Sequence, residues 1–249
     1  MWPFSKSQPV AASGILCEMT DYHSHILPGV DDGVKTMNES LQILAEMKHQ
    51  GVRKVWFTPH IMEDIPNTNA GLRERFQELK EKFRKPEDAY CGTVELNLAA
   101  KYMMDNLFAE RLEADDLLPI YEGGYRYLLV ETTGFTPPMN LLPVLKRMQT
   151  KGYRPLLAHP ERYLYMGTSY YCMLKQEQVA FQLSLPSPTG AYGTYIQKKA
   201  VSLLKAGMYD LTGTDTHSSK HFKEWLGTRI DSRDRDMLWA HFPACRDGL

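Results

Sequence analysis

Apolar residues follow two patterns along the chain, and the two patterns alternate. Short, nearly continuous apolar runs are typical of buried strands, whereas apolar residues that recur every three or four positions are typical of helices with one face on a core. The strands are expected at residues 15–22, 52–58, 91–100, 127–130, 154–158, 179–183 and 209–213. The helices are expected at residues 36–50, 69–85, 141–150, 171–178, 195–206 and 224–242, with a short helix near Phe108.

The alternation of strands and helices predicts an α/β fold in which parallel strands are joined by crossover helices. A chain of 249 residues is long enough for one domain with a substantial core, and the sequence shows neither an internal repeat nor a linker that would divide it. Residues 1–14 are expected to be a flexible N-terminal lead-in. Residues 15–249 are expected to form a single domain.

The charge balance narrows the range of partners. The sequence has 29 basic and 30 acidic residues and a formal net charge of −1, so we expect no broad cationic surface and no sequence-independent binding of nucleic acid. No apolar run is long enough to span a bilayer, so no membrane insertion is expected. The cysteines form no Cys-x-x-Cys pair, and we expect reduced thiols in a cytoplasmic protein. They are Cys17, Cys91, Cys172 and Cys245.

The first strand ends in a short histidine motif. Asp21-Tyr22-His23-Ser24-His25 places two histidines two positions apart, and in a strand such side chains lie on the same face. Pro28-Gly29 and Asp31-Asp32-Gly33 then turn the chain into a loop that brings carboxylates over the strand end. Imidazoles beside carboxylates suit a divalent cation. A surface His-X-His without a metal is the competing interpretation of this motif alone.

Polar residues that can bind a metal recur at the carboxyl ends of the later strands as well. The whole set is His23, His25, His60, Glu131, His159, Asp215 and His217. In a closed βα barrel these strand ends converge on one face, where such enzymes carry their active sites. Any single histidine could be structural, but a repeated position is hard to explain by packing, since each side chain would need its own partner in one crowded place. Imidazole and carboxylate without thiolate suit manganese, iron or zinc in a multinuclear hydrolytic site.

These motifs together resemble those of the PHP (polymerase and histidinol phosphatase) superfamily, and within it the bacterial manganese-dependent protein-tyrosine phosphatases of capsular and exopolysaccharide loci. The motifs that carry the resemblance are Asp21-Tyr22-His23-Ser24-His25, Val30-Asp31-Asp32-Gly33, Thr58-Pro59-His60, Leu129-Val130-Glu131, Ala158-His159-Pro160-Glu161-Arg162-Tyr163 and Gly213-Thr214-Asp215-Thr216-His217. The resemblance implies a distorted, TIM-like (β/α)7 PHP barrel over residues 15–249.

The resemblance also implies roles for these residues. The seven histidines and carboxylates would be metal ligands, Asp32 a proton-transfer residue and Arg162 a phosphate-binding residue. Phosphate monoester hydrolysis would then use metal-activated water, cations and a guanidinium against the charge on the phosphoryl oxygens, and an acid for the leaving phenolate. No Cys-x5-Arg nucleophile loop is present. As alternatives, Asp32 caps the Asp-Asp-Gly turn, and Arg162 pairs with Glu161 or another carboxylate.

One position departs from the family pattern. Lys101 stands where the family has a glutamate that helps to bridge metals, and an ammonium group has only donors to offer. Two unit charges 4 Å apart repel by roughly 4 kcal/mol at an effective dielectric of 20, so an ammonium beside a dication costs about 8 kcal/mol. Removing the proton instead costs about 5 kcal/mol at neutral pH. The departure predicts fewer metals and slow or no turnover, or a lysine turned out of the site. Alternatively, Lys101 is a single substitution in an active parent, or offers its charge to phosphate.

A smaller departure follows His217, where relatives tend to carry an arginine for phosphate. Lys220 or His221 is expected to substitute for it, as a point charge rather than a fork. Tyr192, Tyr195 and the loop at residues 184–193 are candidates for the substrate mouth. Ordinary packing is the competing interpretation for these tyrosines.

The resemblance implies a metal-dependent protein-tyrosine phosphatase that regulates capsule or exopolysaccharide synthesis. Its partner would be a phosphotyrosine protein, the tail of a membrane tyrosine kinase, and phosphate would be the product. The cofactors would be divalent ions, manganese first and iron or zinc as alternatives, at two or three sites in the family and fewer here. An oligomer is compatible with the sequence. The alternatives are a small-molecule phosphomonoesterase of the histidinol-phosphate type and a catalytically weak phosphotyrosine-binding regulator.

Overall fold

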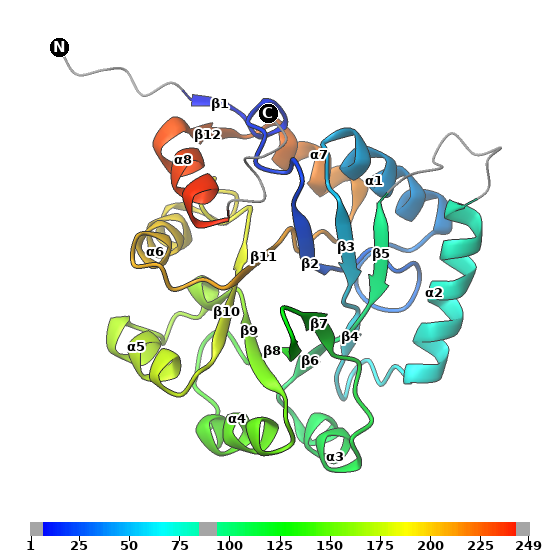
Figure 1. Cartoon of the computed structure of the whole chain (residues 1–249), viewed down its shortest axis with the longest axis vertical. Coiled ribbons are helices and arrows are strands. Elements are labelled where there is room, and N and C mark those ends of the chain that lie inside the picture. Colours follow the sequence, from blue (N-terminus) through cyan, green and yellow to red (C-terminus); the bar gives the residue numbers. More distant parts are fainter. Residues whose placement is uncertain (1–6, 85–93, 243–249) are drawn as a thin grey trace.

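The computed structural model describes residues 7–84 and 94–242 of the chain. Parallel strands occupy the centre of the molecule, and helices surround them (Figure 1). The parallel strands are β2 (Thr20–Ser24), β3 (Lys54–Phe57), β4 (His60–Ile61), β5 (Glu95–Leu98), β6 (Lys101–Met103), β8 (Tyr125–Glu131), β9 (Arg154–Ala158), β10 (Ala180–Ser184) and β11 (Leu211–Gly213). The larger sheet has the order β11-β10-β9-β8-β6-β4, and the smaller sheet has the order β2-β3-β5. The chain is therefore a mixed α/β protein with parallel sheets, as the alternating patterns predict.

The two sheets are joined on both sides. On one side, β2 pairs at Ser24 with Thr216 in the segment that follows β11, and the amide of His25 donates to the carbonyl of Thr216 at 2.9 Å. On the other side, β3 continues into β4 and β5 into β6, each after a break of two residues. The amide of Lys101 donates across these breaks to the carbonyl of Pro59 at 3.0 Å. Hydrogen bonds therefore link neighbouring strands from β2 through β11 and back to β2.

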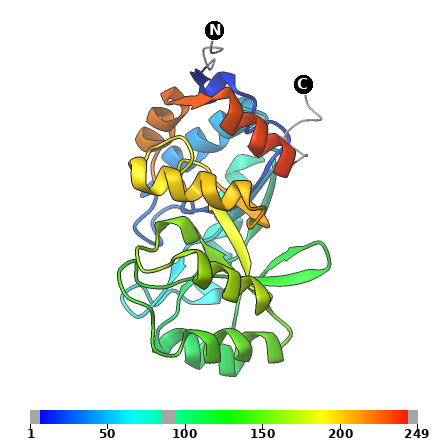
Figure 2. The same cartoon turned by 90° about the vertical axis from the view of Figure 1, so that its left-hand side faces the viewer.

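The helices lie on the outside of the sheets (Figures 1 and 2). They are α1 (Met37–His49), α2 (Asn69–Phe83), α3 (Asn106–Ala114), α4 (Leu141–Thr150), α5 (Thr168–Gln176), α6 (Thr194–Lys205), α7 (Ser219–Gly227) and α8 (Ser232–His241). In α2, Leu72, Phe76, Leu79 and Phe83 recur at helical spacing and are all buried, which explains why this segment forms a helix on the core. Both the helix predicted at 141–150 and the strand predicted at 154–158 are confirmed at their bounds.

The single helix predicted at residues 224–242 is wrong. The segment contains the end of α7, the strand β12 (Arg229–Asp231) and α8. The side chain of Asp231 accepts a hydrogen bond from the amide of Arg233 at 2.9 Å, so it caps α8 and separates it from α7. Apolar residues recur on both sides of this break, so their spacing alone did not indicate where one helix ends and the next begins. Asp231 could have marked the start of α8, but a single capping residue is a weaker indication than the spacing.

The N-terminal segment contributes to this end of the molecule. β1 (Ser7–Pro9) pairs antiparallel with β12, and Val10 is buried within the short 3₁₀ helix Val10–Ala12. Residues 7–14 fall within the expected lead-in, whereas residues 1–6 lie outside the described part of the chain. Cys91, Cys245 and the start of the strand predicted at 91–100 also lie outside it.

A second, smaller cluster of buried apolar side chains lies apart from the main core. Trp56, Ala99, Ile120, Tyr127, Leu129, Leu156, Ala158 and Ala180 form a small buried cluster of their own. Leu129 lies two positions before Glu131 in β8, so the cluster is on the face of the sheet that carries this carboxylate. The short strand β7 (Ile120–Glu122) forms a hairpin with β8 that projects from the domain (Figure 2) and was not predicted from the sequence.

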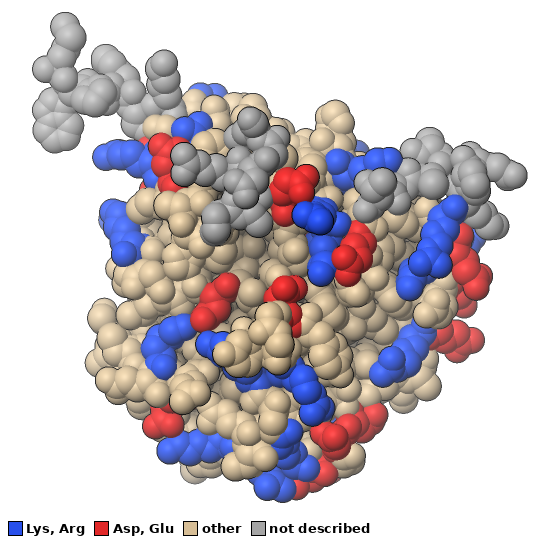
Figure 3. All heavy atoms as spheres, in the orientation of Figure 1, with Lys and Arg blue, Asp and Glu red and all other residues tan. Residues whose placement is uncertain are grey.

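The surface bears both signs of charge. On the face drawn in Figure 3, basic and acidic side chains are interspersed, which agrees with the net charge of −1. Within residues 7–84 and 94–242, no helix combines the length and the apolar character that crossing a bilayer requires.

Candidate metal centre

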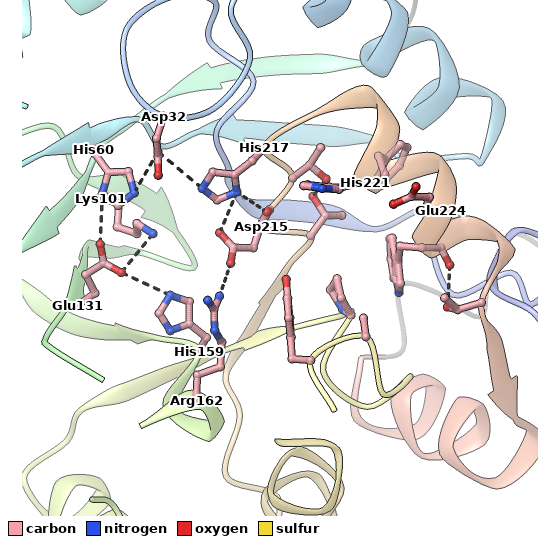
Figure 4. A pocket seen from close by; sticks show the side chains of 18 residues that line it. Asp32, His60, Lys101, Glu131, His159, Arg162, Asp215, His217, His221 and Glu224 are labelled. Carbon is pink, nitrogen blue, oxygen red and sulfur yellow. Dashed lines mark hydrogen bonds and ion pairs between the residues drawn. The ribbon is translucent and has the colours of Figure 1, made fainter. Parts of the chain in front are cut away.

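All seven predicted metal ligands come together at the carboxyl ends of the parallel strands. Five of them line a pocket of about 720 Å³ (Figure 4). These five are His60, Glu131, His159, Asp215 and His217. His23 and His25 are fully buried beside them. Six of the seven, together with Asp32, form two sets, and within each set the candidate ligand atoms lie within 4.8 Å of one another.

The first set, here called the closed group, consists of His23, His159 and Asp215. All three side chains are buried, and Nε2 of His23 lies 3.0 Å from Oδ1 of Asp215. This carboxylate oxygen is buried and makes no hydrogen bond within the described residues. Nδ1 of His159 is likewise buried without such a bond. Buried polar atoms rarely stay unsatisfied, so both atoms are suited to an ion.

The second set, here called the open group, consists of His25, Asp32, His60 and His217. Oδ1 of Asp32 lies 3.6 Å from Nε2 of His60 and 3.8 Å from Nε2 of His217. The imidazole rings of His25 and His217 are stacked with centroids 4.1 Å apart. The side chain of Asp32 is 61% exposed, so this group faces the pocket mouth. Asp32 thus lies in a position to ligate as well as to transfer a proton.

A glutamine from β10 orients the first histidine of the motif. Nδ1 of His23 lies 2.8 Å from Oε1 of Gln182, which is fully buried. The amide nitrogen of Gln182 donates to the carbonyl of Leu183 at 2.6 Å, so its oxygen is held toward the imidazole. His23 therefore donates from Nδ1 and keeps the lone pair of Nε2 for an ion.

The same arrangement recurs in the open group. Nδ1 of His25 lies 2.8 Å from Oδ2 of Asp31, and Nδ1 of His217 lies 2.8 Å from the carbonyl oxygen of Asp215. Each acceptor leaves Nε2 of its imidazole directed into the shared space. Histidines that bind metals are characteristically held in this way, so the donor set fits divalent cations.

Two residues of the closed group have an unusual backbone conformation. His159 has φ of 35° and Asp215 has φ of 54°, both in the left-handed region that non-glycine residues rarely adopt. His159 directly follows β9 and Asp215 lies two residues after β11, and both side chains line the pocket. Strain of this kind is concentrated at functional sites.

Two glycines allow the histidine motif to be approached closely. A Cβ atom on Gly33 would lie 2.0 Å from the carbonyl oxygen of His25, and one on Gly213 would lie 2.5 Å from Cβ of His23. Both positions therefore exclude any larger residue. Gly33 closes the Asp-Asp-Gly turn over the strand end, and Gly213 ends β11 beside it.

The surroundings favour neutral imidazoles at His23, His25 and His159 and ionised carboxylates at Asp215 and Glu131. Burial lowers the pKa of His159 to about 4, and it also lowers the pKa values of His23 and His25. Burial works to raise the pKa of Asp215 and of Glu131, but neighbouring cationic and imidazole groups bring both well below their ordinary values. Neutral imidazoles and ionised carboxylates are the forms that bind metals.

Lys101 lies inside the pocket rather than turned out of it. Its side chain is 3% exposed, and Nζ lies 3.2 Å from Oε2 of Glu131 (Figure 4). The carboxylate of Glu131 also lies 3.2 Å from Nδ1 of His60 and 3.5 Å from Nε2 of His159. Neither Lys101 nor Glu131 belongs to the closed or the open group.

The predicted phosphate residues are placed differently from each other. Nη1 of Arg162 lies 2.7 Å from Oδ2 of Asp215, so this arginine pairs with a carboxylate other than Glu161. Arg162 also lines the pocket. The side chain of Lys220 is 80% exposed, and its Nζ lies 3.9 Å from Oε1 of Glu224. Lys220 is not among the residues that line the pocket. His221, the alternative to Lys220, does line the pocket.

The roles of several supporting residues were not predicted from the sequence, although Asp31 was expected near the strand end. Gln182 and Asp31 orient the histidines, and Asp21 ties two strand ends together by accepting hydrogen bonds from the amides of His23 and Thr214. The signal for Gln182 was its position as a polar residue within an apolar strand. The pocket wall formed by α7 was also missed, because this helix begins five residues earlier than predicted. Its residues in the pocket wall are His221, Phe222, Glu224 and Trp225.

Comparisons with known proteins agree with this geometry. A sequence model of the family described as "Capsular polysaccharide synthesis, CpsB/CapC" matches residues 19–230. The tyrosine-protein phosphatase YwqE of Bacillus subtilis is 26% identical, over 81% of this chain and 78% of its own. The tyrosine-protein phosphatase CpsB of Streptococcus pneumoniae is 26% identical, over 80% of this chain and 83% of its own.

A solved structure from the work on YwqE and CpsB, described as unique metal-dependent tyrosine phosphatases, shares the fold. It superposes with a TM-score of 0.75 at 24% identity, covering 90% of this chain and 87% of the matched chain.

Proposed function

Because the chain belongs to the CpsB/CapC family of capsular polysaccharide synthesis, we propose that it is a metal-dependent protein-tyrosine phosphatase that hydrolyses phosphotyrosine by metal-activated water. The observation that carries the proposal is the convergence of the closed and open groups at one pocket. The relatives named above are tyrosine-protein phosphatases, which favours a protein substrate over histidinol phosphate.

Different pocket residues are proposed to bind the cations, to bind the phosphate and to transfer the proton. Divalent cations held by the two groups would activate water and neutralise charge on the phosphoryl oxygens. Arg162, whose side chain is 38% exposed, offers a guanidinium that can bind the phosphate from the pocket side. Asp32, at the mouth, is placed to give a proton to the leaving phenolate.

The donor chemistry guides the choice of metal. Both groups contain only imidazole and carboxylate, and no cysteine belongs to either. This set suits manganese, with iron or zinc as alternatives, better than a structural zinc site.

The strand pairing supports a distorted, TIM-like (β/α)7 barrel of the PHP type. If β3 with β4 and β5 with β6 are each counted as one interrupted strand, seven parallel strands follow one another in a ring. The interruptions fall beside His60 and Lys101, where the ring is distorted around the site. The single domain predicted over residues 15–249 belongs to the same proposal.

The substrate is proposed to be the phosphorylated tail of a membrane tyrosine kinase, met on the cytoplasmic side. The loops that follow β8 and η2 (Pro160–Arg162) expose Phe135, Met139 and Leu164, and the amide of Leu164 donates to the carbonyl of Gly134. Exposed apolar side chains on loops that start at the pocket residues Glu131 and Arg162 are suited to a peptide rather than a small metabolite. Regulation of capsule or exopolysaccharide synthesis would follow from dephosphorylating such a kinase.

The test is a phosphatase assay of the full chain, freed of metal by chelation and then supplied with Mn²⁺. Phosphate release is expected from a phosphotyrosine peptide only after Mn²⁺ is added, and little from histidinol phosphate. His159→Ala should abolish it, while the matched control His49→Ala, an exposed histidine at the end of α1, should not. No phosphate release from the peptide at saturating Mn²⁺ would refute the proposal.

A further inference from the structure

Lys101 places a fixed positive charge beside the two ligand groups. Its ammonium is buried 3.2 Å from Oε2 of Glu131, and this carboxylate lies between His60 of the open group and His159 of the closed group. We propose that the Lys101 ammonium takes the place of a metal ion at Glu131, so that the chain binds two divalent cations and not a third. The inference rests on the proposed metal-dependent function.

The contacts of Glu131 show why a cation belongs there. A carboxylate that approaches two imidazoles and lies in the pocket has the surroundings of a metal ligand. Yet the ammonium is directed at Oε2, one of its two ligating oxygens. An ammonium cannot itself ligate a metal, but it can satisfy a carboxylate by charge and hydrogen bonding. Glu131 is therefore occupied by a charge from the chain itself.

The backbone holds Lys101 in this position. The residue begins β6, a short strand between β4 and β8, and it pairs in register with His60 on one side and Leu129 on the other. Its amide donates to the carbonyl of Pro59 at 3.0 Å. Pairing on both edges fixes the Cα–Cβ direction of Lys101. The ion pair with Glu131 and the burial of the side chain then hold the ammonium in the pocket.

The balance of charge in the pocket relates Lys101 to one divalent cation. Replacing a lysine by a glutamate removes two units of positive charge, which is the charge that one divalent cation carries. Lys101→Glu should therefore create both the vacancy and the extra carboxylate for a third ion beside Glu131. In the natural chain, the remaining N–H groups of Lys101 line the pocket and are available to a phosphate oxygen.

The test is the Mn²⁺ content of the full chain, measured by elemental analysis after equilibrium dialysis against saturating Mn²⁺. Two equivalents per chain are expected for the natural protein and for Lys101→Arg, which keeps the charge, and three for Lys101→Glu. Lys198→Glu makes the same charge change on an exposed lysine of α6 and should leave two. Any content other than two in the natural chain, or no gain in Lys101→Glu, would overturn the inference.

Anomalous scattering from crystals of the natural chain soaked in Mn²⁺ gives an answer that does not depend on how well a variant folds. One ion is expected at each group and none bonded to Glu131; an ion bonded to Glu131 would defeat the inference. The phosphatase assay separates this result from the proposed function. Two ions without hydrolysis would refute the function alone, and three ions with hydrolysis would refute the inference alone.

Discussion

The closed and open groups differ most in their access to solvent. The side chains of His23, His159 and Asp215 are almost completely buried, whereas those of Asp32 and His217 are 61% and 29% exposed. A substrate can reach only those groups that solvent can also reach. We therefore expect substrate to meet an ion at the open group, and an ion at the closed group to be shielded from it.

The two groups are also in contact. Nε2 of His23 lies 3.1 Å from Nε2 of His25, and Oδ1 of Asp215 lies 3.6 Å from the same atom of His25. Ions bound to both groups would therefore be close neighbours, as in two-metal sites. Asp215 lies close to histidines of both groups, so a change at Asp215 is expected to disturb both ions, whereas Asp32 lies close only to histidines of the open group.

The largest effect is expected from Asp215→Asn in the closed group. The substitution removes the carboxylate that faces His23 and pairs with Arg162, and it should lower kcat/KM for a phosphotyrosine peptide by about 1,000-fold or more, since such ions supply several kcal/mol of stabilisation. Steady-state kinetics with Mn²⁺ titration would measure this loss. Asp236→Asn, at an exposed aspartate of α8, is the matched control. Activity within tenfold of the natural chain would remove Asp215 from the metal centre.

Asp32→Asn in the open group should have a smaller effect that depends on the leaving group. A general acid contributes about 100-fold or more, so hydrolysis of phenyl phosphate should slow by about 100-fold. Hydrolysis of p-nitrophenyl phosphate should slow less, because its leaving group departs without a proton. Initial rates for the two esters provide the measurement.

Equal losses on both esters, together with loss of one Mn²⁺ equivalent, would instead make Asp32 a metal ligand. The position of Asp32 within the open group makes this outcome structurally reasonable. The experiment thus decides which of the two roles the exposed carboxylate has.

Much of the candidate site was predictable because its histidines and carboxylates follow strand ends, and strand ends can be located from apolar runs. His60, Glu131 and His159 were found in this way without any knowledge of their contacts. Gln182 could not be found in this way, since it lies 159 positions from its partner His23. Contacts of this kind depend on register between strands, which a single sequence does not encode locally.

The fold shows the same limits. Long helices with regular apolar spacing were predicted well, whereas β4, β6 and β7, with two or three residues each, were missed. Such short strands exist because neighbours pair with them, as Lys101 of β6 pairs with His60 of β4. Their own residues carry too little periodicity to indicate them.

Gln182→Leu tests how the closed group is held. The change keeps the size of the side chain but leaves Nδ1 of His23 without its acceptor, and loss of such a partner typically lowers metal affinity by about 10- to 100-fold. Competition for Mn²⁺ with a fluorescent chelator would measure the affinity. Gln182→Glu keeps an acceptor at the same place and should bind Mn²⁺ more tightly than Gln182→Leu. Equal affinity in both variants would show that the hydrogen bond does not orient His23.

The smallest effect is expected from Tyr192, whose ring contacts the guanidinium of Arg162 in the pocket wall. The guanidinium lies 4.7 Å from the centroid of the Tyr192 ring, and a cation–π contact at an exposed site contributes about 0.5–1 kcal/mol. Tyr192→Leu should therefore raise KM for a phosphotyrosine peptide by about two- to fivefold with little change in kcat. Tyr192→Phe keeps the ring and should behave like the natural chain. Tyr195→Leu removes a ring that contacts Lys199 instead and is the matched control. A larger loss in Tyr192→Phe than in Tyr195→Leu would mean that the hydroxyl, and not the ring face, acts on the substrate side of Arg162.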